Sequence, residues 1–99
     1  MSILSKIIHA IFDKKPMSEE EVARKLDTLE KGGTEHLSWR TSVVDLLKLL
    51  DLESSLEARK DLASDLGLLR FTGSAADNIA LHAAVMSDVA KRYTKIPEV

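Results

Sequence analysis

Apolar residues recur along this chain at helical spacing in five separate stretches, with polar residues between them. The first stretch covers residues 2–15, and its apolar positions repeat every four residues, each doubled by its neighbour: Ile3, Leu4, Ile7, Ile8, Ile11 and Phe12. Lys6, His9 and Asp13 fall on the opposite side, so the pattern predicts an amphipathic helix. Pro16 is expected to end it, because the residue before a proline avoids the α region.

The second stretch, residues 17–33, begins with Ser18 and has Glu21 three positions later, which is the spacing of a capping box. Gly32 and Gly33 are expected to end this helix. Its buried side is predicted to hold Val22, Leu26 and Leu29. Its solvent side is predicted to carry i, i+4 ion pairs, namely Glu20 with Arg24, Glu21 with Lys25 and Asp27 with Lys31.

A third helix is predicted over residues 39–50. Its buried stripe, at i, i+3, i+4 and i+7, is expected to hold Val43, Leu46, Leu47 and Leu50. Either Ser38 or Ser42 is expected to cap its start, and Asp45 gives Ser42 the capping-box spacing.

The fourth stretch, residues 52–67, repeats the capping-box spacing with Ser54 and Glu57. Gly67 stands where a helix end often takes a left-handed residue. The side chains predicted to face inward are Leu56, Leu62, Ala63 and Leu66.

The fifth and longest stretch, residues 71–93, is expected to start its helix at Ser74 and Asp77. One face of this helix is predicted to hold Ile79, Ala83, Met86, Ala90 and Tyr93. No useful run of alternating apolar and polar residues appears, so no β-sheet is predicted. We therefore predict an all-α fold, a single small domain of five helices. Residues 1–15 would form an amphipathic N-terminal helix and linker, and residues 16–99 a compact bundle of the other four helices.

The composition fits a small globular domain with an aliphatic core. The chain has 99 residues, of which 44% are hydrophobic, 30% charged and only 4% aromatic. It has no cysteine, which excludes disulfides, thiolate metal ligands and cysteine nucleophiles. His9, His36 and His82 are scattered without the spacing of a metal site. We expect no metal and no cofactor, and the lack of cysteine fits a cytoplasmic location.

The charge balance argues against two classes of partner. Fourteen basic and 16 acidic residues give a net charge of −2, so the strong positive field of non-specific nucleic-acid binding is missing. No run of about 18 apolar residues is present, and we expect no transmembrane segment. The amino terminus lacks the basic start and the cleavage site of a secretory signal.

Three blocks cover most of the chain, namely MSILSKIIHAIF, WRTSVVDLLKLLDLESSLEARKDLASDLG and TGSAADNIALHAAVM. Together they resemble a family of small bacterial proteins that is catalogued only as a domain of unknown function. The resemblance implies a five-helix domain with a long flexible loop between its first two helices. This chain has only DKKPM there, and it has Ala80 where relatives often carry a tryptophan. The resemblance implies no reaction, so it assigns no catalytic residue.

Trp39 and Arg40 are the first candidate contact site, because tryptophan and arginine dominate protein-binding hot spots. The alternative is a structural role. Trp39 would fill the gap between loop and bundle with its N–H bonded to backbone, and Arg40 would pair with an acidic neighbour. We favour the structural role, because a core so poor in aromatic residues rarely leaves its largest side chain outside.

Asn78 and His82 lie one helical turn apart beside Asp77, an arrangement that could serve proton transfer. However, no serine has the local context of a nucleophile. A partly buried His82 bonded to a carbonyl or to Asn78 is therefore favoured, and we expect that the protein is not an enzyme.

The fourth and fifth stretches, with the turn between them, superficially match a DNA-binding helix-turn-helix. The helix that would read the bases begins SAADNIALHAAVM, with an acidic residue and no basic one in its first turns. Nucleic acid is thus disfavoured as a partner, and weak or partner-assisted DNA binding is kept as an alternative function.

The amphipathic first helix is the second candidate contact site, through Ile3, Leu4, Ile7, Ile8, Ile11 and Phe12. It could dock on a partner protein, lie at a membrane surface, or pack on its own bundle or on a second copy. Three lysines offset by one aspartate are too few for firm lipid attachment, so weak peripheral membrane contact ranks third. The leading hypothesis is a non-enzymatic interaction or adaptor protein with an unknown protein partner, monomeric or weakly self-associating.

Overall fold

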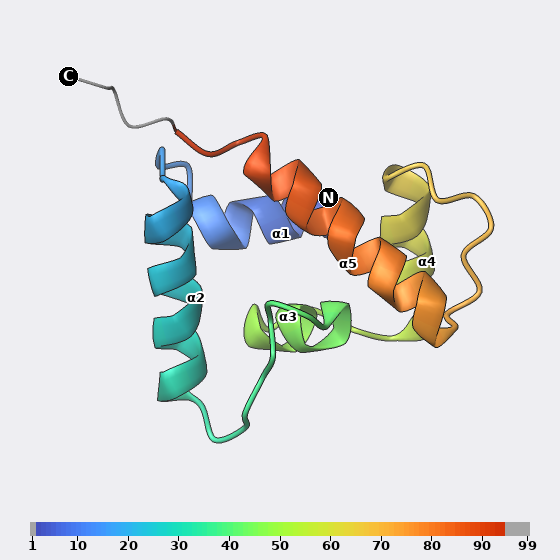
Figure 1. Cartoon of the computed structure of the whole chain (residues 1–99), viewed down its shortest axis with the longest axis horizontal. Helices are drawn as coiled ribbons and strands as arrows, with labels where there is room; N and C mark the ends of the chain where they lie inside the picture. Colours follow the sequence, from blue (N-terminus) through green and yellow to red (C-terminus); the bar gives the residue numbers. More distant parts are fainter. Residues whose placement is uncertain (1, 95–99) are drawn as a thin grey trace.

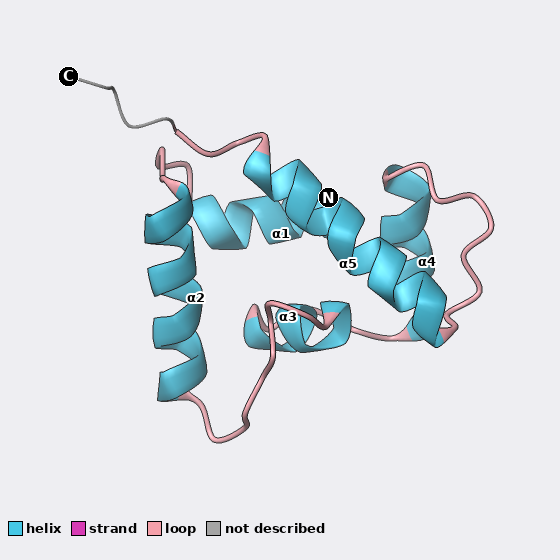
Figure 2. Cartoon of the chain, in the orientation of Figure 1, coloured by secondary structure: helices cyan, strands magenta, loops and turns pink. Residues whose placement is uncertain are grey.

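The computed structural model describes residues 2–94 and contains five helices in this part of the chain. They are α1 (Ile3–Phe12), α2 (Glu19–Gly32), α3 (Val43–Leu49), α4 (Leu56–Asp65) and α5 (Ala75–Ala90) (Figure 1). Figure 2 shows only helices and loops over the described residues, with no strand among them. The predicted all-α fold of five helices is confirmed.

All five helices begin with a serine cap. Each serine hydroxyl accepts a hydrogen bond from the backbone N–H three residues later, which satisfies one of the donors that a helix start leaves free. The capping serines are Ser2, Ser18, Ser42, Ser55 and Ser74. The predicted capping box is confirmed in both directions, because the Ser18 N–H also donates to the Glu21 carboxylate.

Two helix starts differ from the predicted pattern. Helix α3 begins at Val43 and not near residue 39, since Ser42, one of its two expected caps, accepts from the Asp45 N–H. The prediction of Ser54 as the cap of α4 is wrong by one residue. Ser55 accepts from the Ala58 N–H, while the Ser54 carbonyl oxygen accepts from Arg59 Nε.

Helix α1 packs against α2 and α4, and its Ile7 and Ile11 are fully buried. Phe12 is also buried, and its ring lies 6.4 Å from that of Tyr93, centroid to centroid. The first helix is therefore part of the core and not an addition to a bundle of the other four helices. Packing on its own bundle, one of the alternatives for this helix, is the arrangement found. The boundary predicted between residues 15 and 16 falls in the turn between α1 and α2.

The core is aliphatic, with the short α3 packed against both α2 and α5. Its large, fully buried side chains are Ile7, Ile11, Val22, Leu26, Val43, Leu46, Leu47, Leu62, Leu81, Val85 and Val89. Two side chains predicted to be buried lie at the surface, since Leu29 is 42% and Leu56 is 41% exposed. Leu29 and Leu56 each lie near one end of the apolar stripe of their helix.

The side that helix α5 turns to the core matches the predicted side only in part. Met86 and Tyr93 of the predicted side pack against the core, but its first member, Ile79, is 69% exposed. The buried side holds Leu81, Val85 and Val89, with His82 beside them. The alanines of α5 give little contrast between its faces, so the side with the larger branched residues is buried, because it removes more apolar area from water.

Candidate functional site

Trp39 and Arg40 converge on one carboxylate, that of Asp27 on α2. The indole Nε1–H of Trp39 donates to Asp27 Oδ1 at 3.1 Å. Arg40 donates twice, from Nη1 to Oδ1 at 2.8 Å and from Nη2 to Oδ2 at 3.1 Å. Its guanidinium also lies over the Trp39 ring, 4.2 Å from the centroid, within range of a cation–π interaction. These contacts fasten the loop between α2 and α3 to α2.

The placement of Trp39 supports the structural role. Its side chain is buried, as favoured from the sequence, but its N–H bonds to a carboxylate and not to the expected backbone group. Asp27 is the acidic neighbour of Arg40. The hydrogen bonds from Arg40 and Trp39 hold the pKa of Asp27 below its ordinary value, and Asp27 in turn raises the pKa of Arg40.

His82 joins α5 to the same loop. Its Nε2 lies 2.8 Å from the backbone carbonyl oxygen of Trp39, so Nε2 carries the proton and donates. This confirms a nearly buried histidine bonded to a carbonyl. Asn78 is not its partner, because the Asn78 side-chain oxygen accepts from Arg59 Nη1 at 2.8 Å. The Asp77 carboxylate is turned away to Thr72. The proton-transfer arrangement is therefore not formed.

His36 lies between a carboxylate and a hydroxyl, in the order of a catalytic triad that the sequence did not suggest. Its Nδ1 is 3.6 Å from Glu30 Oε1, and its Nε2 is 3.5 Å from Ser38 Oγ. Both distances exceed the roughly 2.6–3.2 Å of a working proton relay. The His36 side chain is also 83% exposed, so water competes for both contacts. The geometry favours a solvated polar surface over a reacting centre.

The polar groups around Trp39 are occupied by one another. A shallow cavity of about 280 Å³ opens between α2 and residues 36–41. The Ser38 N–H beside it donates to Asp45 Oδ2 at 2.8 Å. In the part of the chain that the structure describes, no buried side-chain nitrogen or oxygen lacks a hydrogen-bond partner. The cavity therefore presents few polar groups that a ligand would be needed to satisfy.

The second candidate contact site, α1, is largely used by the fold. Ile7, Ile11 and Phe12 are buried, which removes half of its predicted anchors from the surface. The other three, Ile3, Leu4 and Ile8, are half-buried and packed against the core. Leu4 and Ile8 line a groove of about 330 Å³ near Arg92. This burial weakens both docking and membrane contact through α1.

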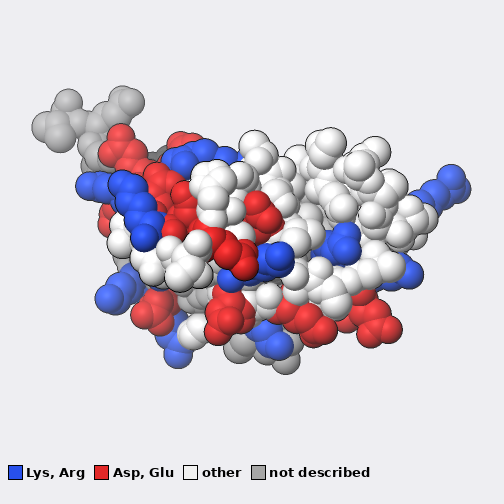
Figure 3. Space-filling model, turned by 90° about the horizontal axis from the view of Figure 1, so that it is seen from below, with Lys and Arg blue, Asp and Glu red and all other residues white. Residues whose placement is uncertain are grey.

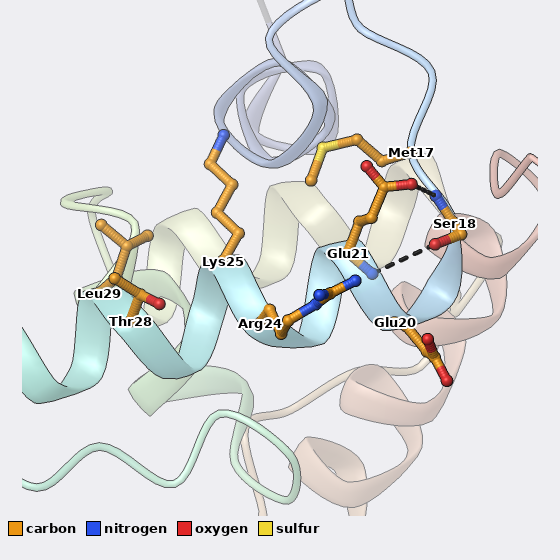
Figure 4. Close-up of a pocket in the computed structure, with 8 residues that line it drawn as sticks. All are labelled: Met17, Ser18, Glu20, Glu21, Arg24, Lys25, Thr28 and Leu29. Carbon is orange, nitrogen blue, oxygen red and sulfur yellow. Dashed lines mark hydrogen bonds between the residues drawn. The ribbon is translucent and has the colours of Figure 1, made fainter.

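A surface groove of about 610 Å³ follows α2 near the end of α1 (Figure 4). Lys25 points from it toward α1 and donates to the carbonyl oxygens of Ala10 at 3.0 Å and Ile11 at 2.8 Å. A cation thus stands at the negative end of the α1 dipole. The predicted i, i+4 pairs of α2 do not form between the described side chains, because Glu21, Lys25 and Asp27 bind elsewhere. Lys25, one of the two cations that line the groove, is therefore engaged in contacts within the fold.

An uncharged surface on α5 is the feature that the sequence prediction missed. Seven residues of α5 are exposed and none is charged; this set, called here the α5 face, is Ala75, Ala76, Ile79, Ala80, Ala83, Ser87 and Ala90. Leu69, in the preceding loop, is 88% exposed. Figure 3 shows an area without Lys, Arg, Asp or Glu in its upper right, on the side of the molecule where α4, α5 and their loop lie in Figure 1. The run of alanines in α5 is the feature of the sequence that indicates this uncharged surface.

A cavity of about 330 Å³ adjoins the α5 face at Ala80, lined by residues 67–71 and by Asp77. Thr72 fixes this loop, since its N–H and its hydroxyl both donate to Asp77 Oδ2 at 2.7 Å. The hydrogen bonds from Thr72 hold the pKa of Asp77 below its ordinary value. The loop edge beside the α5 face is therefore held in place by a charged group.

Other site chemistry was searched for over the same residues. In residues 2–94 no group of three or more His, Asp and Glu side chains is placed to hold a metal ion. No described helix is long and apolar enough to cross a membrane. Residues 66–74 separate α4 from α5, more than the three or four residues of a helix-turn-helix, and the α5 face offers no basic group to DNA.

The family model described as Domain of unknown function (DUF3597) matches residues 11–97. The chain belongs to the DUF3597 family. This confirms the resemblance found in the sequence. The solution structure of a conserved unknown protein from Rhodopseudomonas palustris is also similar, with a TM-score of 0.72 and 37% sequence identity over 98% of this chain and 96% of that chain. No curated protein matches the chain.

The description of the DUF3597 family names no activity, so a function has to be inferred from the geometry of the chain. The matched range includes α2 to α5. It therefore includes the α5 face and also Asp27 with its partners Trp39 and Arg40, called here the Asp27 cluster. The polar groups of the Asp27 cluster are hydrogen-bonded to one another, whereas the residues of the α5 face are exposed to solvent. The α5 face of this DUF3597 chain is therefore its candidate functional site.

Proposed function

We propose that this DUF3597 protein is a non-enzymatic protein-interaction module that acts in the cytoplasm and binds through its α5 face. The observation that carries the proposal is the exposure of Ile79, 69%, on a helix side without charge. Leu69 extends the same apolar surface. Large exposed aliphatic side chains on an uncharged surface favour burial against another protein, because each removes apolar area from water.

The occupied polar groups support a binding role over an enzymatic one. Asp27 is bound by Trp39 and Arg40, His82 by a backbone carbonyl, and Asp77 by Thr72. Catalytic acids and bases need access to a substrate, whereas these groups hold loops in place. Their contribution to function is to keep α5 and its preceding loop rigid.

Photo-crosslinking in the native host cell tests the proposal. The full chain would carry p-benzoylphenylalanine at position 79 or, as a matched control, at position 60, where the exposed Lys60 lies on the charged surface of α4. We expect a discrete protein crosslink from position 79 and none of the same mass from position 60. Absence of any crosslink at position 79, with the chain folded and expressed, would overturn the proposal.

A further inference from the structure

The exposed residues of α5 follow the spacing of a helix-packing seam. Ala76, Ala80, Ala83, Ser87 and Ala90 are separated by alternating steps of four and three residues, and all are exposed. This is the repeat of positions a and d in a coiled coil, which turn toward a partner helix. The partner suited to this surface is therefore a helix.

Small residues along a seam let two helices approach closely, but only where the facing side chains are small as well. Ile79 is the one large side chain of the α5 face, and it stands away from the middle. Around a two-fold axis at Ala83, an antiparallel copy of α5 brings Ile79 opposite Ser87. The large side chain then meets a small one on both sides of the axis.

We propose that the α5 face binds a second copy of this chain, through antiparallel α5 helices related by a two-fold axis near Ala83. This inference rests on the proposed function of the α5 face as an interaction surface. The inference specifies that the partner is a second copy of the chain and that the two α5 helices meet near Ala83.

Charge distribution favours this partner and this direction. The first turn of α5 carries Asp77. Lys91 and Arg92 directly follow its last turn, and because Arg92 pairs with Asp88 at 3.2 Å, Lys91 supplies the net positive charge of that end. Antiparallel pairing brings the acidic end of one helix toward the basic end of the other, and it also aligns the two helix dipoles favourably. A parallel pair would bring like charges together at both ends.

The size of the surface sets the strength of the complex. A 16-residue helix is about 24 Å long and about 10 Å wide, so the paired faces bury far less than the roughly 800 Å² per partner of a standard stable interface. The dimer is therefore weak, with a dissociation constant on the order of 100 µM. The chain is a monomer when dilute and pairs where its local concentration is high.

Sedimentation equilibrium of the full chain, from about 10 µM to about 1 mM, tests the pairing. The average mass should rise toward twice that of the monomer. Ala83→Glu places two carboxylates at the axis and should weaken pairing at least tenfold, and so should Ala83→Lys with two cations. An equimolar mixture of these two variants should pair more tightly than either alone. Lys60→Glu on α4 should pair like the original chain.

Circular dichroism would first show that each variant keeps its helices, which an exposed position allows. A mass that stays monomeric at about 1 mM, or an Ala83→Glu variant that pairs as well as the original, would overturn the dimer. The crosslink at position 79 separates the two proposals. A crosslink to a different protein, with a monomeric chain, refutes self-pairing but supports the interaction function. Absence of any crosslink refutes the interaction function, while the sedimentation result alone decides self-pairing.

Discussion

His82 on α5 donates a hydrogen bond to the backbone carbonyl of Trp39, 2.8 Å away and 43 residues earlier in the chain. Because Trp39 and Arg40 also bind Asp27 on α2, one loop joins α2 to α5 through four side chains, those of Asp27, Trp39, Arg40 and His82. The exposed α5 face is thus fixed in orientation from its buried side. His82 serves as the link between the core and the candidate interaction surface.

Replacement of His82 tests this link. His82→Ala leaves the Trp39 carbonyl without its donor and opens a small cavity, so we expect a loss of about 2–3 kcal/mol in the free energy of unfolding. Urea denaturation measures it. His36→Ala is the matched control, because His36 is exposed and should change stability by less than about 0.5 kcal/mol. Equal effects of the two substitutions would contradict the structural role of His82.

Lys25 offers a second test, directed at α1. Lys25→Met removes both hydrogen bonds to the last carbonyls of α1 and the charge opposite its dipole, at a cost of about 1–2 kcal/mol. Hydrogen exchange should speed up in α1 more than in α3. Arg24→Met, an exposed neighbour on the same helix, should leave α1 protection unchanged. If both variants accelerate α1 equally, Lys25 does not hold that helix.

The pH dependence of stability follows from two carboxyls. Arg40 lowers the pKa of Asp27, and Thr72 lowers that of Asp77. A carboxyl whose pKa is lower in the folded state adds stability above its unfolded pKa and loses it as the pH falls through its folded pKa. The free energy of unfolding should therefore decrease below about pH 4.

Urea midpoints measured between about pH 6 and about pH 2 would follow this loss. The double variant Asp27→Asn with Asp77→Asn should be less stable than the original at neutral pH, with a shallower decrease in acid. An unchanged slope would show that other carboxyls cause the acid dependence.

Local pattern predicted the helices of this fold well, because each has its own apolar stripe and a serine before it. The cap of α4 was misplaced because Ser54 and Ser55 are adjacent, and spacing alone does not choose between them. Packing on the bundle was only one of the alternatives for helix α1, because amphipathicity does not say what covers the apolar side. Its burial depends on α4, which no local pattern relates to it.

The candidate site could be predicted only in part. The structural role of Trp39 and the carbonyl partner of His82 followed from residue type and burial, but Asp27 was assigned to Lys31 on its own helix. A bidentate arginine from a distant loop binds that carboxylate instead. Three residues of the α5 face, Ile79, Ala83 and Ala90, were predicted to share one helix face with Met86 and Tyr93, because they follow a helical period. The competing stripe of Leu81, Val85 and Val89 fills the core better.

The packing of α1 against α4 also has a consequence for how the protein is made. A ribosome synthesises α1 first, yet the surfaces that cover Ile7, Ile11 and Phe12 include residues from the later half of the chain. Until those emerge, the nascent chain carries an uncovered amphipathic helix of the kind that chaperones bind. The protein therefore closes its core late in translation, and a chain cut before α4 lacks one of the two helices that cover its first helix.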